Sequence, residues 1–285
     1  LYAIEGLEHV RDVEVPTPWG HPSDSLRIGR IGDLEVVFLA RHGRHHTYSP
    51  TEVPYRANLW ALRSLGVRWI ISVSAVGSLQ HHVRPLDKLV PDQFIDRTHQ
   101  RPLSFFSEGI VAHVAVADPY CPNLSRLLAE TGAQLMPPGR ELHRGGTYLC
   151  MEGPAFSTRA ESELYRSWGC SVIGMTNHTE ARLAREAEMA YATLAMVTDY
   201  DCWHPDHEAV SVELVIDNLK ANATLAQGII AAAGKAVALQ RPSSRAHQAL
   251  RHALMTPPDR VPSTTRRRID LFTTPYWGPY PSAGS

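Results

Sequence analysis

The sequence predicts a single α/β domain with a mostly parallel central sheet flanked by helices. Apolar runs of strand length, such as residues 34–40 and 68–77, alternate with stretches whose apolar residues recur every three or four positions. The strand-like runs are rich in Val and Ile, as is typical of strands that helices cover on both faces. With 44% hydrophobic residues among 285, the chain can bury a core of this kind.

The strands and helices can be placed in order along the chain. A helical pattern that stops at a glycine lies between the first two strand-like runs, and a long helical pattern follows the last one. The clearest predicted elements are strand 34–40, helix 55–66, strand 68–77, strand 191–199 and helix 212–239.

Two further helices are predicted from capping signals. Thr158 and Glu161 have the spacing of a capping box, and Gly169 suits the end of the helix that they begin. Asn177 and Glu180 mark a second helix start in the same way. Apolar segments precede both starts, so each helix is expected to follow a strand.

The composition changes from Arg241 onward to a high density of Pro, Ser, Thr and Gly. We therefore predict a main domain over residues 1–240, and over 241–285 one peripheral helix near 243–255 with a loosely ordered tail. Because the chain opens with Leu1 rather than Met, we expect it to be a trimmed product.

Charge and cysteine content limit the classes of partner. A formal net charge of -1 gives no broad basic field, so nucleic acid is not expected as a partner. Neither a long apolar run nor a signal-peptide profile is visible, which predicts a cytoplasmic protein without a membrane partner. The four scattered cysteines predict reduced thiols rather than disulfides or a zinc site: Cys121, Cys150, Cys170 and Cys202.

Polar side chains at the ends of the predicted strands suggest an anion site. Arg41 and His42 follow the first strand, Ser74 lies within the second, and Thr176 precedes a helix start. Ligands of open α/β sheets bind at the carboxyl ends of strands, where a guanidinium, an imidazole, hydroxyls and a helix N-terminus would suit a phosphate-like anion. Singly, such an Arg is more often a surface ion pair and such a Thr only a cap, so the prediction depends on convergence.

Asp199 and Asp201 follow the last predicted strand, one residue apart. If the strand continues through them they point the same way, and burial together with pairing would raise the pKa of one carboxyl group. Such a pair could share a proton, donate to a purine N7 and accept from an exocyclic amine. Capping of the next turn, or binding of a surface cation, explains the spacing equally well.

His42, His45 and His46 are close in sequence and are candidate metal ligands. The arginines among them would repel a cation, and no carboxylate stands at ligand spacing. The sequence therefore predicts no metal.

Six segments together resemble the trimeric purine nucleoside phosphorylase family. The resemblance extends over about residues 10 to 235, in order and without large gaps. The segments are 38–66 (FLARHGRHHTYSPTEVPYRANLWALRSLG), 74–79 (SAVGSL), 92–98 (DQFIDRT), 151–162 (MEGPAFSTRAES), 175–187 (MTNHTEARLAREA) and 197–212 (VTDYDCWHPDHEAVSV).

This resemblance implies a fold of the nucleoside phosphorylase type and a reaction, the phosphorolysis of 5′-methylthioadenosine in purine and methionine salvage. Phosphate is a co-substrate, and no metal or organic cofactor is implied. The implied phosphate ligands are Arg41, His42, Ser74, the backbone of Ala75 and Thr176. The purine would be bound and protonated by Asp199 and Asp201.

The resemblance also implies the remaining nucleoside contacts and a homotrimer. Phe156 and Met175 would flank the base and ribose, although Phe156 alone would be read as a core residue. His113 would reach the 5′ end from a neighbouring subunit. An apolar slot for the methylthio group would consist of Val212, Val215 and Ile216, for which simple core packing is an equal alternative.

Two arguments refine the expected activity. A 6-amino group can donate to a carboxylate and a 6-oxo group cannot, so the aspartates favour adenine over hypoxanthine or guanine. The family usually begins with a strand and a Gly-rich loop that touches phosphate, and this chain starts just after that point. Without them the sheet loses a strand and the phosphate site a wall.

Three alternatives stay open at this point. One is a broader adenosine or 5′-deoxyadenosine phosphorylase, and another is a nucleoside-binding protein without catalysis. A hydrolytic nucleosidase is disfavoured, because water as the nucleophile gives no reason for a cationic anion site.

Overall fold

The computed structural model describes residues 6–207 and 210–280. Its centre is a seven-stranded sheet in the order β6-β8-β9-β4-β10-β5-β7. Four of the six pairings are parallel and two are antiparallel, which confirms the mostly parallel sheet. The strands are β4 (Trp69–Ser78), β5 (Lys88–Val90), β6 (Gln93–Arg97), β7 (Leu142–Arg144), β8 (Thr147–Met151), β9 (Val172–Gly174) and β10 (Ala190–Asp199).

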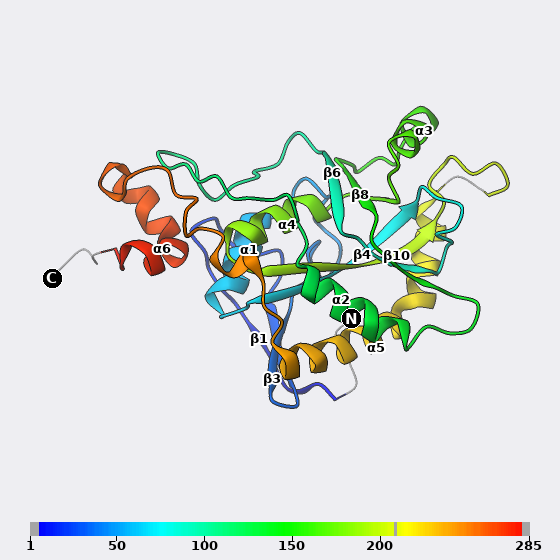
Figure 1. Cartoon of the computed structure of the whole chain (residues 1–285), viewed down its shortest axis with the longest axis horizontal. Helices are drawn as coiled ribbons and strands as arrows, with labels where there is room; N and C mark the ends of the chain where they lie inside the picture. Colours follow the sequence, from blue (N-terminus) through cyan, green and yellow to red (C-terminus); the bar gives the residue numbers. More distant parts are fainter. Residues whose placement is uncertain (1–5, 208–209, 281–285) are drawn as a thin grey trace.

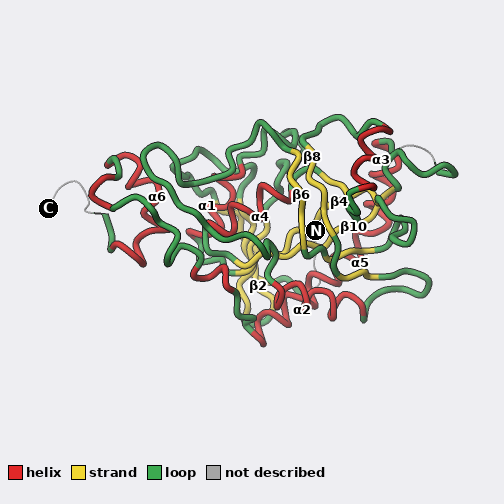
Figure 2. Tube along the Cα trace, turned by 45° about the horizontal axis from the view of Figure 1, so that its top comes forward, coloured by secondary structure: helices red, strands yellow, loops and turns green. Residues whose placement is uncertain are grey.

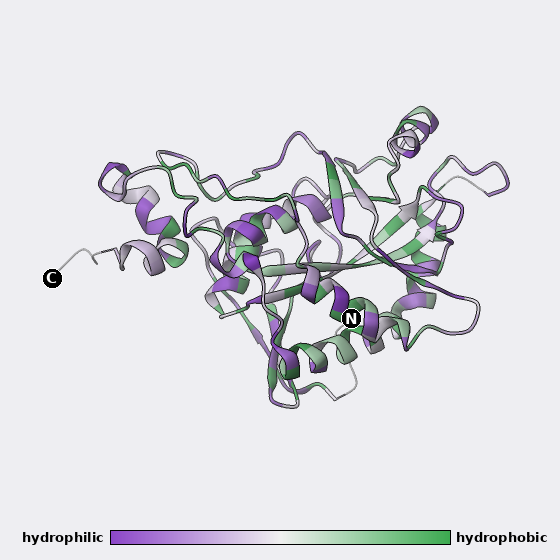
Figure 3. Ribbon diagram, in the orientation of Figure 1, coloured by the Kyte–Doolittle hydropathy of each residue, from purple (hydrophilic) through white to green (hydrophobic). Residues whose placement is uncertain are grey.

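Helices cover both faces of this sheet. Figure 1 shows α1 and α4 on one side of β10 and α2 on the other, and Figure 2 repeats this arrangement from a second direction. In Figure 3 the helices carry both hydrophilic and hydrophobic colours, as helices with one face on a sheet should. The helices are α1 (Tyr55–Ser64), α2 (Pro122–Ala133), α3 (Arg159–Ser167), α4 (Asn177–Glu186), α5 (Val212–Gln240) and α6 (Ser263–Trp277), with 3-10 turns at Arg245–Gln248 and Pro258–Arg260.

Strand β10 is buried along all ten of its residues. Ala192 and Leu194 pack with residues of α2 and α5, whereas Tyr191 packs with residues of α1 and α4. Because successive side chains of a strand point to opposite faces, burial on both sides requires an apolar run without alternation. This is the run from which the sequence predicted the strand.

The strand predicted at 34–40 does not lie in the central sheet. β3 (Leu34–Phe38) pairs with β2 (Leu26–Ile31), and β2 pairs with β1 (Glu8–Val13), all antiparallel, in a separate three-stranded sheet. The expectation of a strand, a helix and a strand in one parallel sheet was therefore wrong for its first strand. A cavity of about 580 Å³ lies between residues of β3 and β4, and α5 contributes to its lining.

The helix starts were predicted correctly, but one for an incomplete reason. Thr158 and Glu161 form the expected reciprocal capping box, and Gly169 ends the segment at a positive φ of 77°. At α4 the N-cap is Thr176, without a side-chain capping bond, and Glu180 pairs with Arg41 instead of the helix start. Spacing alone does not distinguish a capping glutamate from one that turns inward.

The C-terminal segment is more ordered than predicted. The expected helix near 243–255 is reduced to a 3-10 turn, whereas α6 occupies a stretch that was expected to be loosely ordered. Ile269 and Phe272 of α6 are buried in the same core cluster as Phe105. Figure 1 places α6 at the end of the molecule away from α3. Two apolar anchors thus order a segment whose composition is otherwise typical of a linker.

None of the helices in the described ranges is both long enough and apolar enough to span a lipid bilayer.

Substitution Phe272→Ala is expected to lower the free energy of unfolding by about 3–5 kcal/mol, because it removes a ring that is 2% exposed and leaves a cavity. Leu239→Ala, at a side chain that is 86% exposed, should change it by less than about 0.5 kcal/mol. Urea unfolding followed by circular dichroism measures both. Equal midpoints for the two variants would show that α6 does not belong to the cooperative core.

Candidate functional site

The carboxyl end of β10 lies directly beside the carboxyl end of β4. Parallel pairing puts Asp199 opposite Gly77. A Cβ atom on Gly77 would lie 2.9 Å from Asp199 Oδ1 and 3.3 Å from Asp201 Cβ. The missing side chain therefore gives both acids room to converge over β4.

The convergence arises differently from the prediction. β10 ends at Asp199, and Asp201 lies in a turn with a φ of 54°, so the strand does not continue through both residues. The Asp201 N–H donates to Asp199 Oδ1 at 2.7 Å. It is this turn, rather than the two-residue repeat of a strand, that brings the two acids together.

Burial is the main cause of the unusual acidity of Asp199. It raises the pKa of the carboxyl group to about 6, against the lowering effect of hydrogen bonds from Thr198 and the Asp201 N–H. The charge of Asp201 also raises this pKa but is the smallest of the causes, so pairing contributes less than predicted. The pKa of Asp201 is raised as well, again chiefly by burial.

The hydroxyl of the neighbouring Thr198 contacts the Asp199 carboxyl group. It lies 2.7 Å from Asp199 Oδ2 and 3.2 Å from the Val76 carbonyl oxygen. The shorter contact is a hydrogen bond that Thr198 donates to the carboxylate, and it opposes the rise of the Asp199 pKa that burial causes.

Arg41 is held at the other part of the site by a buried ion pair. Its Nε and Nη2 donate to the Glu180 carboxylate, Nη2 also donates to Ser72 Oγ at 2.7 Å, and Nη1 donates to the Val73 carbonyl at 3.3 Å. The forked donors that the sequence analysis assigned to a phosphate are thus engaged by Glu180. An anion would meet the remaining N–H of Nη1.

His42 is fixed in one orientation. Its Nδ1 lies 2.9 Å from the Tyr48 carbonyl oxygen and its ring stacks on His46 with centroids 4.4 Å apart. Burial lowers the pKa of the imidazole, so the ring is neutral near pH 7, with Nδ1 protonated and Nε2 free to accept. A neutral ring in this tautomer presents Nε2 as a hydrogen-bond acceptor.

Ser74, Ala75 and Thr176 lie on the two elements that hold the ion pair of Arg41 and Glu180. Ser74 and Ala75 follow Val73 on β4, and the Ser74 hydroxyl is 3.0 Å from Tyr148 Oη. Thr176 is buried at the start of α4, one helical turn before Glu180. Its hydroxyl makes no capping bond, and the first N–H groups of α4 favour an anion nearby.

The spacing along β4 separates the two parts of the site. Ser74 and Gly77 are three residues apart, which corresponds to about 10 Å in a strand. The acids beside Gly77 and the anion-binding groups near Ser74 are therefore separated by a distance that a nucleoside with a phosphate at C1′ can bridge.

Phe156 and Met175 lie on two loops that contact each other. A Cβ on Gly153 would lie 2.5 Å from Met175 Sδ. Phe156 is 40% exposed, which excludes its alternative role as a core residue and leaves its ring available.

Arg101, which is not among the predicted site residues, joins these loops. It donates to the Met175 carbonyl at 2.5 Å and to the Glu152 carbonyl at 2.7 Å, and its side chain is fully buried. No sequence signal distinguishes it from a surface arginine, because its partners are far away in the chain.

The start of α5 is attached to the loop that carries the acids. Asn218 donates to the Thr198 carbonyl at 2.6 Å, and the Val210 N–H donates to the Asp201 carbonyl at 2.8 Å. Val212 and Ile216 are 58% and 43% exposed, and Val215 is half-buried. Core packing is therefore contradicted for the first two, which present an apolar surface at the edge of the site.

His113 is the predicted residue that this chain does not bring to the acids. It is exposed, and its N–H donates to the Ala253 carbonyl at 2.9 Å, beside the C-terminal segment.

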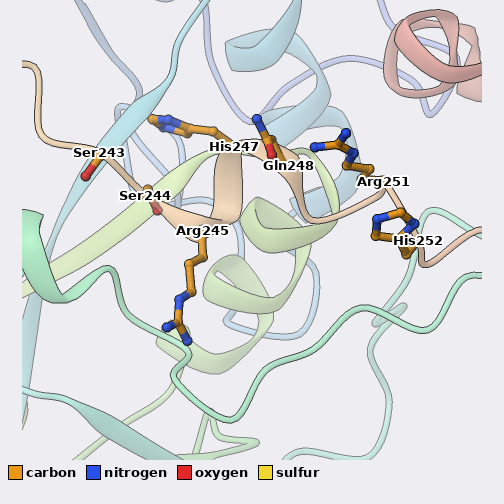
Figure 4. Close-up of a pocket in the computed structure, with 7 residues that line it drawn as sticks. All are labelled: Ser243, Ser244, Arg245, His247, Gln248, Arg251 and His252. Carbon is orange, nitrogen blue, oxygen red and sulfur yellow. The ribbon is translucent and has the colours of Figure 1, made fainter.

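Two other possible ligand sites were compared with this one. A cavity of about 540 Å³ is lined by residues 243–252, but Figure 4 shows Arg245 pointing away from His247 and Arg251, so the side chains do not converge on a ligand. Within the described ranges, no group of three or more His, Cys, Asp or Glu side chains is arranged to hold a metal ion.

Comparison with known proteins identifies the family. Residues 5–234 match the model of the phosphorylase superfamily. The chain belongs to this superfamily. It is 68% identical over 280 residues to an S-methyl-5'-thioadenosine phosphorylase of Prochlorococcus marinus, covering 98% of this chain and 89% of that protein. A Thermosynechococcus vestitus protein of the same name is 57% identical, with 97% and 96% covered.

Solved structures of superfamily members share the fold. A methylthioadenosine phosphorylase from an antarctic soil metagenomic library superposes with a TM-score of 0.91 at 49% identity, over 95% of this chain and 94% of that one. A methylthioadenosine phosphorylase of Schistosoma mansoni in complex with adenine gives 0.78 at 34% identity, over 82% and 88%. The nucleoside phosphorylase fold and the family resemblance predicted from the sequence are both confirmed.

The raised pKa of Asp199 predicts a pH dependence of stability. Its folded-state pKa of about 6 exceeds the ordinary value of 3.8, so the stability that protonation contributes is fully present below about pH 3.8 and is lost as the pH rises through 6. The variant Asp199→Asn has no titrating group at this position, so it does not lose this stability as the pH rises. Relative to the unchanged protein, the variant should gain about 2.4 kcal/mol between pH 4 and pH 8.

The exposed Asp259→Asn is the matched control, and denaturant unfolding at both pH values is the measurement. A constant difference between Asp199→Asn and the unchanged protein across this range would contradict the raised pKa.

Proposed function

We propose that this protein catalyses the phosphorolysis of 5′-methylthioadenosine to adenine and 5-methylthioribose 1-phosphate, in purine and methionine salvage. The observation that carries the proposal is the pair of acids beside Gly77, one of which has a pKa raised to about 6, set about 10 Å along β4 from the anion-binding groups. Relatives of 68% and 57% identity that are named for this activity support it.

The proposed reaction forms one bond and breaks one. A phosphate oxygen bonds to C1′, and the bond from C1′ to the purine N9 breaks with its electron pair leaving on the base. Asp199 supplies the proton that neutralises the departing purine at N7, and Asp201 accepts a hydrogen bond from the 6-amino group. A carboxyl group with a pKa of about 6 is closer to the working pH than an ordinary one, which favours this transfer.

The proposed phosphate ligands supply different kinds of hydrogen-bonding groups. Arg41 supplies its remaining Nη1 N–H, Ser74 and Thr176 supply hydroxyls, and the start of α4 and the backbone of Ala75 supply neutral dipoles. His42 accepts from a phosphate hydroxyl through Nε2. No metal or organic cofactor takes part in the proposed reaction.

The nucleoside is proposed to lie between the two loops joined by Arg101. Phe156 and Met175 flank the base and ribose, and Val212, Val215 and Ile216 face the methylthio group. His113 is proposed to complete this end from a neighbouring subunit of a cytoplasmic homotrimer. The position of His113 beside Ala253 in its own chain is compatible with such a role.

A broader specificity is the second candidate. The Schistosoma mansoni relatives include proteins described as adenosine/methylthioadenosine phosphorylases. The exposed apolar side chains of Val212 and Ile216 favour the methylthio substituent over a 5′-hydroxyl group. Comparison of kcat/KM for methylthioadenosine, adenosine and inosine separates the candidates, and a preference for inosine would exclude the proposed role of the aspartates.

Adenine release should require inorganic phosphate. The expected result is that methylthioadenosine yields adenine and a sugar phosphate in stoichiometric amounts with phosphate, and no detectable adenine without it. Chromatography of the products measures both. Undiminished adenine release without phosphate indicates a nucleosidase, and binding without cleavage in either condition indicates a binding protein.

Asp199→Asn is expected to lower kcat by about 10²- to 10⁴-fold, because an amide cannot supply the proton, while KM for the nucleoside changes by only a few fold. Steady-state kinetics at saturating phosphate measure both constants. An unchanged kcat would remove Asp199 as the proton donor.

A further inference from the structure

Glu180 has no role in the proposed reaction, although it is the most heavily engaged acid near the anion-binding groups. Its side chain is 11% exposed and accepts from Arg41, from Tyr191 Oη at 2.8 Å and from Ser72 Oγ at 3.3 Å. Burial raises the pKa of this carboxyl group, but the charge and hydrogen bonds of Arg41 outweigh it and hold the pKa below its usual value. Glu180 is therefore a buried anion at neutral pH.

The ion pair changes what Arg41 can offer to a ligand. A guanidinium has five N–H donors. Those on Nε and Nη2 bind Glu180 and Ser72, and one on Nη1 binds the Val73 carbonyl, so a single N–H remains. The positive charge of Arg41 is matched by the negative charge of Glu180 at hydrogen-bond distance, so the pair is neutral towards an incoming anion.

The other groups of the anion site do not restore a positive charge. His42 is neutral near pH 7, because burial lowers the pKa of its ring. Ser74, Thr176 and the start of α4 contribute only dipoles. An anion that binds here is attracted by hydrogen bonds and partial charges, and Glu180 repels it.

We propose that Glu180 acts as a resident counter-anion: it competes with phosphate and with the sugar phosphate product for Arg41, and it thereby sets how tightly the site holds an anion. The inference rests on the proposed function, in which Arg41 belongs to the phosphate site. A phosphorolytic enzyme must release an anionic product as well as bind an anionic substrate. Glu180 favours that release by keeping the fork of Arg41 engaged, which leaves a single guanidinium N–H to hold the anion.

The sign of the effect separates this role from a merely structural one. Glu180→Gln keeps the shape and one acceptor for Arg41 but removes the negative charge. Inorganic phosphate should then bind more tightly, with KM for phosphate and its calorimetric Kd both lower by about tenfold or more. The inhibition constant of the sugar phosphate product should fall by a similar factor. If Glu180 only kept Arg41 in place, all three constants would rise.

Glu152→Gln is the matched control. Glu152 is also 11% exposed and pairs with a buried arginine, Arg101, which lies outside the proposed phosphate ligands. The same change of charge there should leave the calorimetric Kd for phosphate within about twofold. A similar tightening in both variants would mean that any buried acid has this effect, and it would overturn the proposal.

Thermal unfolding tests the inference without turnover. Glu180→Gln leaves Arg41 as an uncompensated buried cation, so its Tm should drop in phosphate-free buffer and recover with millimolar phosphate by more than the unchanged protein gains. If the variant fails to fold without phosphate, recovery of the fold in 100 mM phosphate supports the proposal, and failure to recover overturns it.

The inference and the proposed function fail in different ways. Phosphate binding by Glu180→Gln that is no tighter than that of the unchanged protein overturns the inference, while phosphate-dependent adenine release by the unchanged protein still upholds the function. Adenine release that does not depend on phosphate overturns the function instead.

Discussion

The parallel pairing of β4 with β10 is the constraint on which the rest of the molecule depends. Both strands are central, β10 is buried on both faces, and their register puts Asp199 opposite Gly77. Their pairing runs from Ala190 opposite Trp69 to Val197 opposite Val76, and an irregularity precedes the pair of Asp199 with Gly77. The position of Asp199 is therefore a consequence of this strand pairing, and that of Asp201 is a consequence of the turn that follows.

The two aspartates and Glu180 lie in different electrostatic surroundings. The acids lie in a buried turn where desolvation favours the neutral carboxyl form, whereas Glu180 lies beside a cation that keeps it ionised. Two buried acids of one site thus have pKa values shifted in opposite directions, upward to about 6 for Asp199 and downward for Glu180. The difference comes from neighbours, since both side chains are almost fully buried.

Much of this fold can be predicted from local sequence patterns. The remaining features depend on contacts between residues that are distant in the sequence. The strands at 68–77 and 191–199 and the capping box at Thr158 were predictable because their signals lie within the segments themselves. The membership of β3 in a separate sheet was not, because the choice of partner strand is not written in its own residues. For α6, two buried side chains, Ile269 and Phe272, outweigh a composition that is typical of a linker.

Some residues of the candidate site could also be predicted from the sequence, and others could not. Strand ends and the family resemblance indicated the polar residues, and the structure brings the two aspartates together. The partner of Arg41 could not be predicted, because Glu180 is 139 residues away and its spacing suggested a cap. Arg101 had no signal at all, because its contacts to the loops around Glu152 and Met175 exist only in the folded chain.

Helix α5 connects regions that seem independent. Its first turns are attached to the acid-bearing loop through Asn218, and its later residues Ile230 and Val237 line the cavity between β3 and β4 that also reaches Arg41. Twenty-nine residues make a rod of about 44 Å. An axial shift of this rod would therefore move the acid-bearing loop and the lining of the cavity beside Arg41 together.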